Sequence, residues 1–200
     1  MAQIDYYFST ISPYTYLAGT RMEEVAARHG ADIAYKPFDI MAVFPRTGGT
    51  APAERHPARL ELRAQELRRQ SRKHDLPMDL DPPTRAVNPA PSSYAFIAAM
   101  RAGGGGDLGK LVQAFTGAVW RDRRDIAQDD VIADCLEAAG FDRGLAGMAM
   151  LQGADEYGRN TEHAVLAGAF GAPFYIVDGT EKFWGQDKIE DLDLYLAGNL

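Results

Sequence analysis

The amino-acid sequence predicts an α/β fold in which two strand-containing halves flank a block of helices. The N-terminal residues follow a strand–helix–strand pattern, and the C-terminal residues follow a strand–turn–strand–helix pattern. Between about Val43 and Ala169 the sequence offers no strand candidate. Because a strand–helix–strand unit places its strands parallel and a tight turn joins antiparallel strands, we expect one mixed sheet.

The N-terminal half begins with aromatic and β-branched residues that predict a strand over Gln3–Phe8. Ser12 and Pro13 then open a predicted helix, since serine is a preferred N-cap and proline is tolerated at the first helical position. This helix is expected to run to about His29, before a glycine that ends it. A second strand over Asp32–Phe38 completes the unit.

The middle of the chain alternates helical patterns with connectors rich in proline and glycine. Its hydrophobic periodicity predicts helices over residues 58–74, 93–101, 108–120, 128–139 and 141–152. The connectors cover residues 45–57 and 77–91.

The C-terminal half reads as a hairpin followed by a helix. A strand over Phe174–Val177 meets the turn signal Asp178-Gly179, and a returning strand at Phe183 precedes a helix over Gln186–Leu196. The order βαβ and then ββα is that of the thioredoxin fold. We therefore predict a thioredoxin-like domain made of residues 1–42 and 165–200, with a helical insertion domain over residues 43–164.

Composition excludes several classes of function. Hydrophobic residues make up 46% and charged residues 24% of the 200 residues, as in ordinary globular proteins. Cys135 is the single cysteine, so an internal disulfide, CxxC redox chemistry and a cysteine-built zinc site are excluded. The four histidines lack metal-ligand spacing, so no metal is predicted.

Charge and hydropathy bear on partners and location. A formal net charge of −7 argues against a nucleic-acid partner, which requires a basic surface. The N-terminus does not resemble a signal peptide, and no apolar run reaches the length of a membrane span. We expect a cytoplasmic protein with no membrane partner.

Three segments carry the functional signal. Residues 8–18 read Phe-Ser-Thr-Ile-Ser-Pro-Tyr-Thr-Tyr-Leu-Ala, residues 168–174 read Gly-Ala-Phe-Gly-Ala-Pro-Phe, and residues 183–188 read Phe-Trp-Gly-Gln-Asp-Lys. In this order they resemble segments of the kappa-class glutathione transferases and of the bacterial 2-hydroxychromene-2-carboxylate isomerases, in the thioredoxin superfamily. The Ala-Val-Trp segment that ends at Trp120 resembles the isomerases.

The resemblance implies glutathione as cofactor and Ser12 as the catalytic residue. Ser12 stands where a thiol-disulfide enzyme has its cysteine, and a hydroxyl there can donate to the glutathione thiolate and lower its pKa. In the relatives the proline matching Pro173 is cis. The implied glutathione-binding residues are Ser12, Pro13, Tyr14, Ala172, Pro173, Gln186 and Asp187. The simpler interpretation, that Ser12 only caps its helix, stays open.

Other residues have weaker signals. Lys36, Asn88 and Trp120 are candidate substrate-binding residues, although Lys36 also fits a solvated lysine. The relatives carry Gly-Asn-Thr where this chain has Gly-Gly-Thr ending at Thr50, so Gly49 removes one expected contact with glutathione. The basic run over residues 59–73 is interpreted as a solvated helix face.

The sequence therefore predicts a glutathione-dependent isomerase of a small aromatic carboxylate, with Ser12 stabilising the thiolate. One alternative is a kappa-like glutathione transferase or peroxidase, and another is a non-catalytic thioredoxin-like binding module. The resemblance also implies a homodimer. Between the two enzyme families, the short Trp-Gly-Gln-Asp ending and the segment at Trp120 favour the isomerase.

Overall fold

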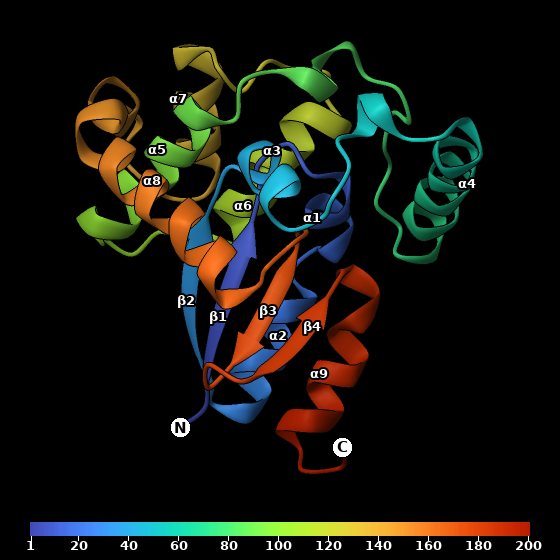
Figure 1. Cartoon of the computed structure of the whole chain (residues 1–200). Coiled ribbons are helices and arrows are strands. Elements are labelled where there is room, and N and C mark those ends of the chain that lie inside the picture. Colours follow the sequence, from blue (N-terminus) through green and yellow to red (C-terminus); the bar gives the residue numbers. More distant parts are fainter.

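The fold is built on one four-stranded sheet with the strand order β2-β1-β3-β4 (Figure 1). The computed structural model describes residues 1–200. The strands are β1 (Gln3–Phe8), β2 (Asp32–Pro37), β3 (Phe174–Val177) and β4 (Glu181–Trp184). β1 and β2 are parallel, whereas β3 runs antiparallel to both β1 and β4. The predicted mixed sheet and its C-terminal hairpin are confirmed.

Nine α-helices surround the sheet. They are α1 (Pro13–Ala18), α2 (Arg21–His29), α3 (Ile40–Val43), α4 (Pro57–Lys73), α5 (Ala90–Ala102), α6 (Leu108–Trp120), α7 (Asp129–Ala138), α8 (Ala149–Ala167) and α9 (Ile189–Leu196). Helices α3 to α8 all lie between β2 and β3 in the chain, so the thioredoxin-like fold with a helical insertion is confirmed. None of these helices has the length and hydropathy needed to cross a membrane.

Two helix predictions are wrong in their extent. The helix expected from Pro13 to His29 is broken at Gly19, whose φ of 61° ends α1, and α2 starts at Arg21. The helix expected over residues 141–152 is a 3-10 helix over Arg143–Met148 followed by α8, which continues to Ala167. Small and polar residues along α8 weaken the apolar periodicity that would have revealed it.

The short elements also differ from the prediction. The connector expected over residues 45–57 contains the 3-10 helices Phe44–Arg46 and Pro52–Glu54. The expected C-terminal helix begins with the 3-10 turn η5 (Gln186–Lys188) before α9. Such turns are common where a helix starts or a connector bends, and they leave little periodic signal.

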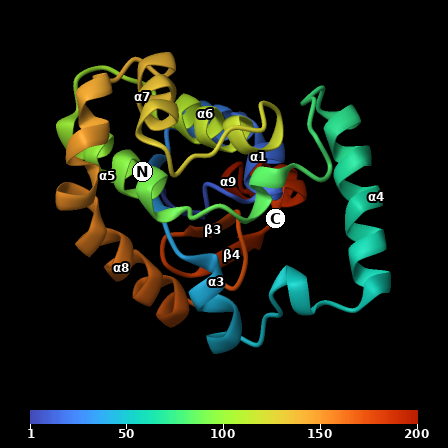
Figure 2. The same cartoon turned by 90° about the horizontal axis from the view of Figure 1, so that it is seen from above.

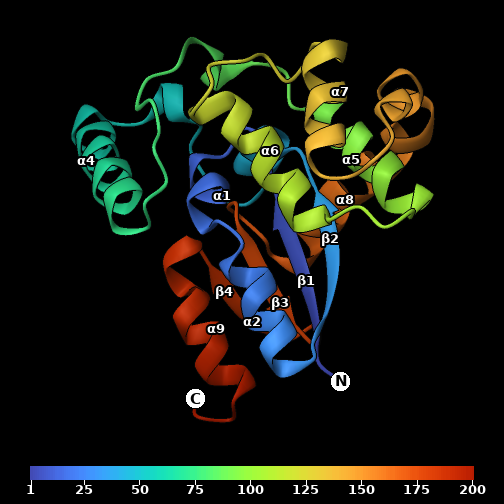
Figure 3. The ribbon, with the colours of Figure 1, turned by 180° about the vertical axis from the view of Figure 1, so that it is seen from behind.

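Hydrophobic clusters lie on both faces of the sheet. Alternate residues of a strand face opposite sides, so Tyr6 belongs to a cluster of 32 buried residues and Tyr7 to a cluster of eight. In Figure 3, α2 and α9 lie in front of the sheet, while α8 packs against β2 and α3. The larger cluster joins Tyr6 to Phe96 and Trp120 of the inserted helices, so the two predicted domains share one core. Their exact boundaries stay a prediction.

Candidate functional site

Ser12 lies in the loop that joins β1 to α1. Its extended backbone, with φ of −78° and ψ of 123°, makes it the N-cap of α1, and Pro13 takes the first helical position. The Thr15 N–H donates to Ser12 Oγ at 3.2 Å, and the Ser12 N–H donates to the Ser9 carbonyl at 3.0 Å. Ser12 therefore caps α1, as the simpler interpretation expects, and the cap uses only a lone pair of the hydroxyl oxygen.

The Ser12 proton points the other way. Ser12 Oγ donates to the backbone carbonyl of Ala172 at 3.0 Å, and the Ala172–Pro173 bond is cis, as predicted. The antiparallel pairing of β1 with β3, which matches Tyr7 with Phe174, brings these two loops together. Cap acceptor and hydrogen-bond donor are thus two simultaneous roles of one hydroxyl. Ser12 is buried, with 8% of its surface exposed.

The loop is fixed from behind by two inserted helices. Trp120, at the end of α6, is buried and donates through Nε1 to the Ile11 carbonyl at 3.1 Å. At the start of α5, Ser92 donates to the Thr10 hydroxyl at 2.9 Å. The structure therefore places Trp120 as a support of the Ser12 loop, and its contact with a substrate stays a prediction.

Gln186 and Asp187 begin η5 on the side of α1. Gln186 is buried, and its Oε1 accepts from the guanidinium of Arg21 at 2.6 Å. Asp187 is exposed and lies close enough to Tyr14 for its charge to raise the pKa of that phenol, although burial raises it more. The structure brings both η5 residues to the helix that Ser12 caps.

Lys36 and Asn88 have different surroundings. Lys36 forms an ion pair with Asp5 at 2.9 Å and lies 3.3 Å from Nδ1 of His163, on the face of the sheet that α8 covers. None of these contacts reaches Ser12. Asn88 is exposed and accepts from the Ala90 N–H at 3.0 Å, so it helps to start α5 beside the Thr10 loop.

Gly49, in place of the relatives' asparagine, packs against Phe44. A Cβ at this position would lie 2.5 Å from Phe44 Cδ1 and 3.2 Å from its Cα. A side chain there would require the Phe44 backbone and ring to move. The departure from the family pattern is therefore built into this loop.

Two arginines near the site were not predicted from the sequence. Arg63 of α4 is half-buried, with its guanidinium carbon 5.9 Å from the ring centroid of Trp120. Arg55 is also half-buried, 5.5 Å above the Phe44 ring. The interpretation of the basic run as a solvated face is wrong for Arg63. The residue pattern of α4 did not indicate that Arg63 is half-buried, because Leu67 is the only fully buried residue of this helix.

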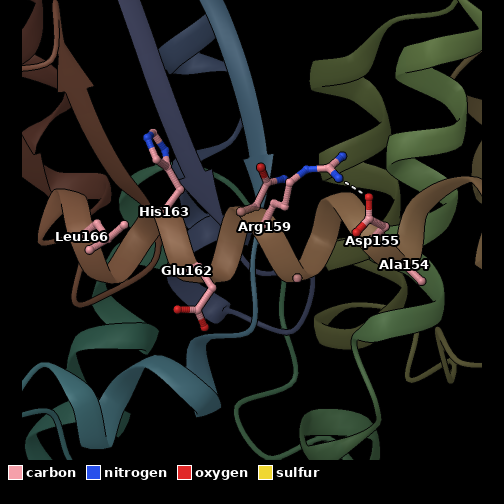
Figure 4. A pocket seen from close by; sticks show the side chains of 8 residues that line it. Ala154, Asp155, Arg159, Glu162, His163 and Leu166 are labelled. Carbon is pink, nitrogen blue, oxygen red and sulfur yellow. Dashed lines mark hydrogen bonds and ion pairs between the residues drawn. The ribbon is translucent and has the colours of Figure 1, made fainter.

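A hollow on α8 is not part of this site. Figure 4 shows its lining side chains along one helix, with Arg159 directed to Asp155. The lining residues are Ala154, Asp155, Gly158, Arg159, Asn160, Glu162, His163 and Leu166. All come from α8, so the hollow includes neither Ser12 nor the residues of η5.

The comparisons with known proteins agree with this geometry. A 2-hydroxychromene-2-carboxylate isomerase of Sphingobium xenophagum is 29% identical over 200 residues, covering 96% of this chain and 97% of that protein. Glutathione S-transferase kappa 1 of Caenorhabditis elegans is 34% identical over 83 residues, or 41% of this chain and 36% of that protein. The structure of a 2-hydroxychromene-2-carboxylate isomerase shares the fold with a TM-score of 0.78 and 24% identity, covering 98% of this chain and 95% of that one.

The resemblance predicted from the three motifs is confirmed, since relatives of both names are found. The named isomerases span nearly the whole chain and favour an isomerase. Residues 3–197 match the DsbA-like thioredoxin domain. The strands, the Ser12-capped helix and the cis-proline loop all lie inside this match, and the chain belongs to the DsbA-like thioredoxin domain family.

Proposed function

We propose that this chain is a glutathione-dependent isomerase of a small aromatic carboxylate, similar to 2-hydroxychromene-2-carboxylate isomerase. One observation carries the proposal: the Ser12 hydroxyl starts α1 and lies 3.0 Å from the carbonyl that precedes cis-Pro173. The full-length relatives named as isomerases support the reaction class.

The polar groups around Ser12 fit the cysteinyl part of glutathione. In the structure the Ser12 hydroxyl and the Ala172 carbonyl satisfy each other. A ligand with a thiolate and a peptide N–H can accept from Ser12 and donate to Ala172, so two hydrogen bonds replace one. Pairing with the backbone of a single residue is a short form of strand addition. The N–H of Tyr14 is a further donor, because first-turn amides lack partners within the helix.

The γ-glutamyl end of the peptide fits η5. The exposed carboxylate of Asp187 is suited to the ammonium group, and Arg21 holds the carbonyl oxygen of Gln186, which fixes the orientation of that side-chain amide. Pro13 and Pro173 have no N–H, so they shape the backbone around the thiol without competing for its hydrogen bonds.

When bound, glutathione would supply a thiolate for reversible addition to a conjugated carbon of the substrate, which would allow rotation about the former double bond before the thiolate leaves again. The protein's contribution is to stabilise the thiolate through Ser12 and to hold the reacting groups together. Lys36, Asn88 and Trp120 remain proposed substrate contacts.

A second candidate is a kappa-like glutathione transferase or peroxidase, which the kappa 1 relative favours. It uses the same activated thiolate and differs in the electrophile. A non-catalytic binding module is the third, and the Thr15–Ser12 cap alone is compatible with it.

The deciding experiment measures isomerisation of 2-hydroxychromene-2-carboxylate with and without glutathione. Glutathione-dependent turnover supports the proposal. Turnover only of chlorodinitrobenzene or a peroxide indicates the transferase or peroxidase. If calorimetry detects no binding of glutathione, the remaining candidate is the non-catalytic binding module.

We also propose a homodimer and a cytoplasmic location, where the thiol of glutathione stays reduced. Exposed apolar side chains on α8 are available for such an interface: Met150, Leu151 and Leu166 are 74%, 86% and 83% exposed. A monomer mass in light scattering at micromolar concentration contradicts the dimer.

A further inference from the structure

Two half-buried guanidinium groups, whose charges act on Tyr14 in the helix that Ser12 caps, have no carboxylate partner. Arg55 donates through Nε to the Thr50 carbonyl at 2.9 Å, which leaves its terminal amines free. Arg63 stacks on Trp120 and forms neither a hydrogen bond nor an ion pair. Two neighbouring acids are engaged elsewhere: Glu66 with Arg69, and Asp81 with Arg85.

This arrangement is costly without an anion. Burial lowers the pKa of Arg63 and that of Arg55, and repulsion from Arg63 and Arg59 lowers the pKa of Arg55 further. Ionised groups withdrawn from water are normally paired, since desolvation is unfavourable. The planar guanidinium is also the side chain best matched to a carboxylate, which it binds through two parallel N–H groups.

The two arginines face the helix that carries Ser12. Tyr14 lies two residues after Ser12, and the charges of Arg63 and Arg55 both act on its phenol. Helix α1 packs against α4, which stands apart from the other inserted helices on the α1 side (Figure 2). Arg63 also contacts Trp120, whose Nε1–H donates to the Ile11 carbonyl in the Ser12 loop. Two routes therefore connect Arg63 to the Ser12 loop.

Both guanidinium groups are held by aromatic rings in fixed positions. Phe44 is confined between Gly49 and Arg55, and its ring orients the guanidinium that the Thr50 carbonyl also holds. Trp120 is 1% exposed, and its ring lies under the Arg63 guanidinium, 5.9 Å from the guanidinium carbon. A pre-positioned donor loses little conformational entropy when it binds an anion.

We propose that Arg63 and Arg55, together with the Tyr14 hydroxyl, bind the carboxylate of an acidic ligand beside Ser12. The inference rests on the proposed function for the identity of that ligand. The same chemistry is offered by the carboxylate of the aromatic substrate and by the glycyl carboxylate of glutathione, and the experiment separates the two.

The test uses the full-length protein and calorimetry. 2-Hydroxybenzoate is titrated in the absence of glutathione, and 2-hydroxybenzamide is the uncharged control. The variants are R63Q and R55Q, with R68Q as a matched control because Arg68 is exposed on the same helix and forms no ion pair. Circular dichroism establishes that each variant is folded. We expect R63Q to weaken 2-hydroxybenzoate binding about tenfold or more, and R68Q to leave it unchanged.

A second titration compares glutathione with its glycyl ethyl ester. If R63Q weakens glutathione but not the ester, the arginines hold the peptide's carboxylate. If R63Q weakens neither 2-hydroxybenzoate nor glutathione more than R68Q does, the carboxylate site is overturned. Binding of 2-hydroxybenzoate that depends on Arg63, in a protein without glutathione-dependent turnover, removes the proposed function and keeps the site.

Discussion

Ser12 Oγ donates to the carbonyl of Ala172 at 3.0 Å while it accepts from the Thr15 N–H at 3.2 Å. One hydroxyl therefore caps α1 and also ties that helix to the cis-proline loop. The cap uses a lone pair of Oγ, and the bond to Ala172 uses its proton. Ser12 can therefore donate to a ligand in place of Ala172 without loss of the cap. This separation makes the proposed catalytic role testable independently of stability.

Replacing Ser12 with alanine is expected to raise the pKa of bound glutathione by about 1–2 units. A hydrogen bond to a charged group contributes roughly 1.5–3 kcal/mol, and one pKa unit corresponds to 1.36 kcal/mol. Turnover near neutral pH should fall about ten- to a hundredfold, because less of the thiol is ionised. The absorbance of the bound thiolate, followed against pH in both proteins, measures the shift. Equal midpoints would exclude the donor role.

Stability alone does not report on that role. Loss of the cap in S12A should cost about 0.5–2 kcal/mol whether or not Ser12 is catalytic. Ser9→Ala is the matched control, because Ser9 Oγ lies in the same loop, is buried and has no hydrogen-bond partner. We expect S9A to be as stable as the wild type or more stable, with an unchanged thiol titration.

The sequence predicted the sheet well because its strands carry local signals. Alternating apolar residues marked β1, and the Asp-Gly turn marked the hairpin at residues 174–184. The break at Gly19 was missed because the apolar residues continue into α2, and a glycine within a helical pattern does not by itself announce a positive φ. Helix α8 was cut short because tertiary packing, rather than its own periodicity, maintains it.

The sequence predicted only those residues of the site that belong to recognisable motifs. Ser12 and the cis bond before Pro173 belong to local patterns, and the structure brings them together. Arg55 and Arg63 carry no such pattern, since Arg55 lies in a connector and Arg63 lies in a basic run that was interpreted as solvated. The position of Arg55 depends on the ring of Phe44, and that of Arg63 depends on the ring of Trp120. Neither ring belongs to the same helix as its arginine. A single sequence does not encode that contact in any recognisable spacing.

Trp120→Phe is expected to lower stability by about 1–3 kcal/mol. The substitution keeps an aromatic ring under Arg63 but removes the Nε1–H that the Ile11 carbonyl accepts at 3.1 Å, which leaves a carbonyl in the Ser12 loop without its donor. We also expect a lower kcat, because the loop is less firmly placed. Chemical denaturation and steady-state kinetics measure the two effects. An unchanged free energy of unfolding would show that the indole N–H does not support the loop.

Restoring the relatives' asparagine with Gly49→Asn should destabilise the protein by about 1–3 kcal/mol, as overpacking does. The new Cβ would meet Phe44 Cδ1 at 2.5 Å. The double variant with Phe44→Ala should recover part of this loss, because the ring no longer blocks the side chain. A double-mutant cycle by thermal unfolding gives the coupling. Additive effects of the two substitutions would contradict the predicted clash.

Glu23 of α2 makes the stability depend on pH. Burial raises the pKa of its carboxyl from 4.5 to about 7, and although Tyr35 donates to Oε1 at 3.2 Å, Oε2 is buried without a partner. The folded state therefore holds this proton more tightly than the unfolded state does. Stability should be highest below about pH 4.5 as far as this group is concerned, and should fall as the pH rises to about 7. The loss is about 3 kcal/mol.

Glu23→Gln removes this titration with little change of volume. We expect its free energy of unfolding, measured in urea between pH 5 and 8, to vary less than that of the wild type and to exceed it above pH 7. Glu24→Gln is the matched control, because Glu24 is exposed on the same helix, and it should keep the wild-type slope. If the E23Q and E24Q profiles run parallel across this range, Glu23 is ionised in the folded protein at pH 5, and its buried carboxyl is not the source of the pH dependence.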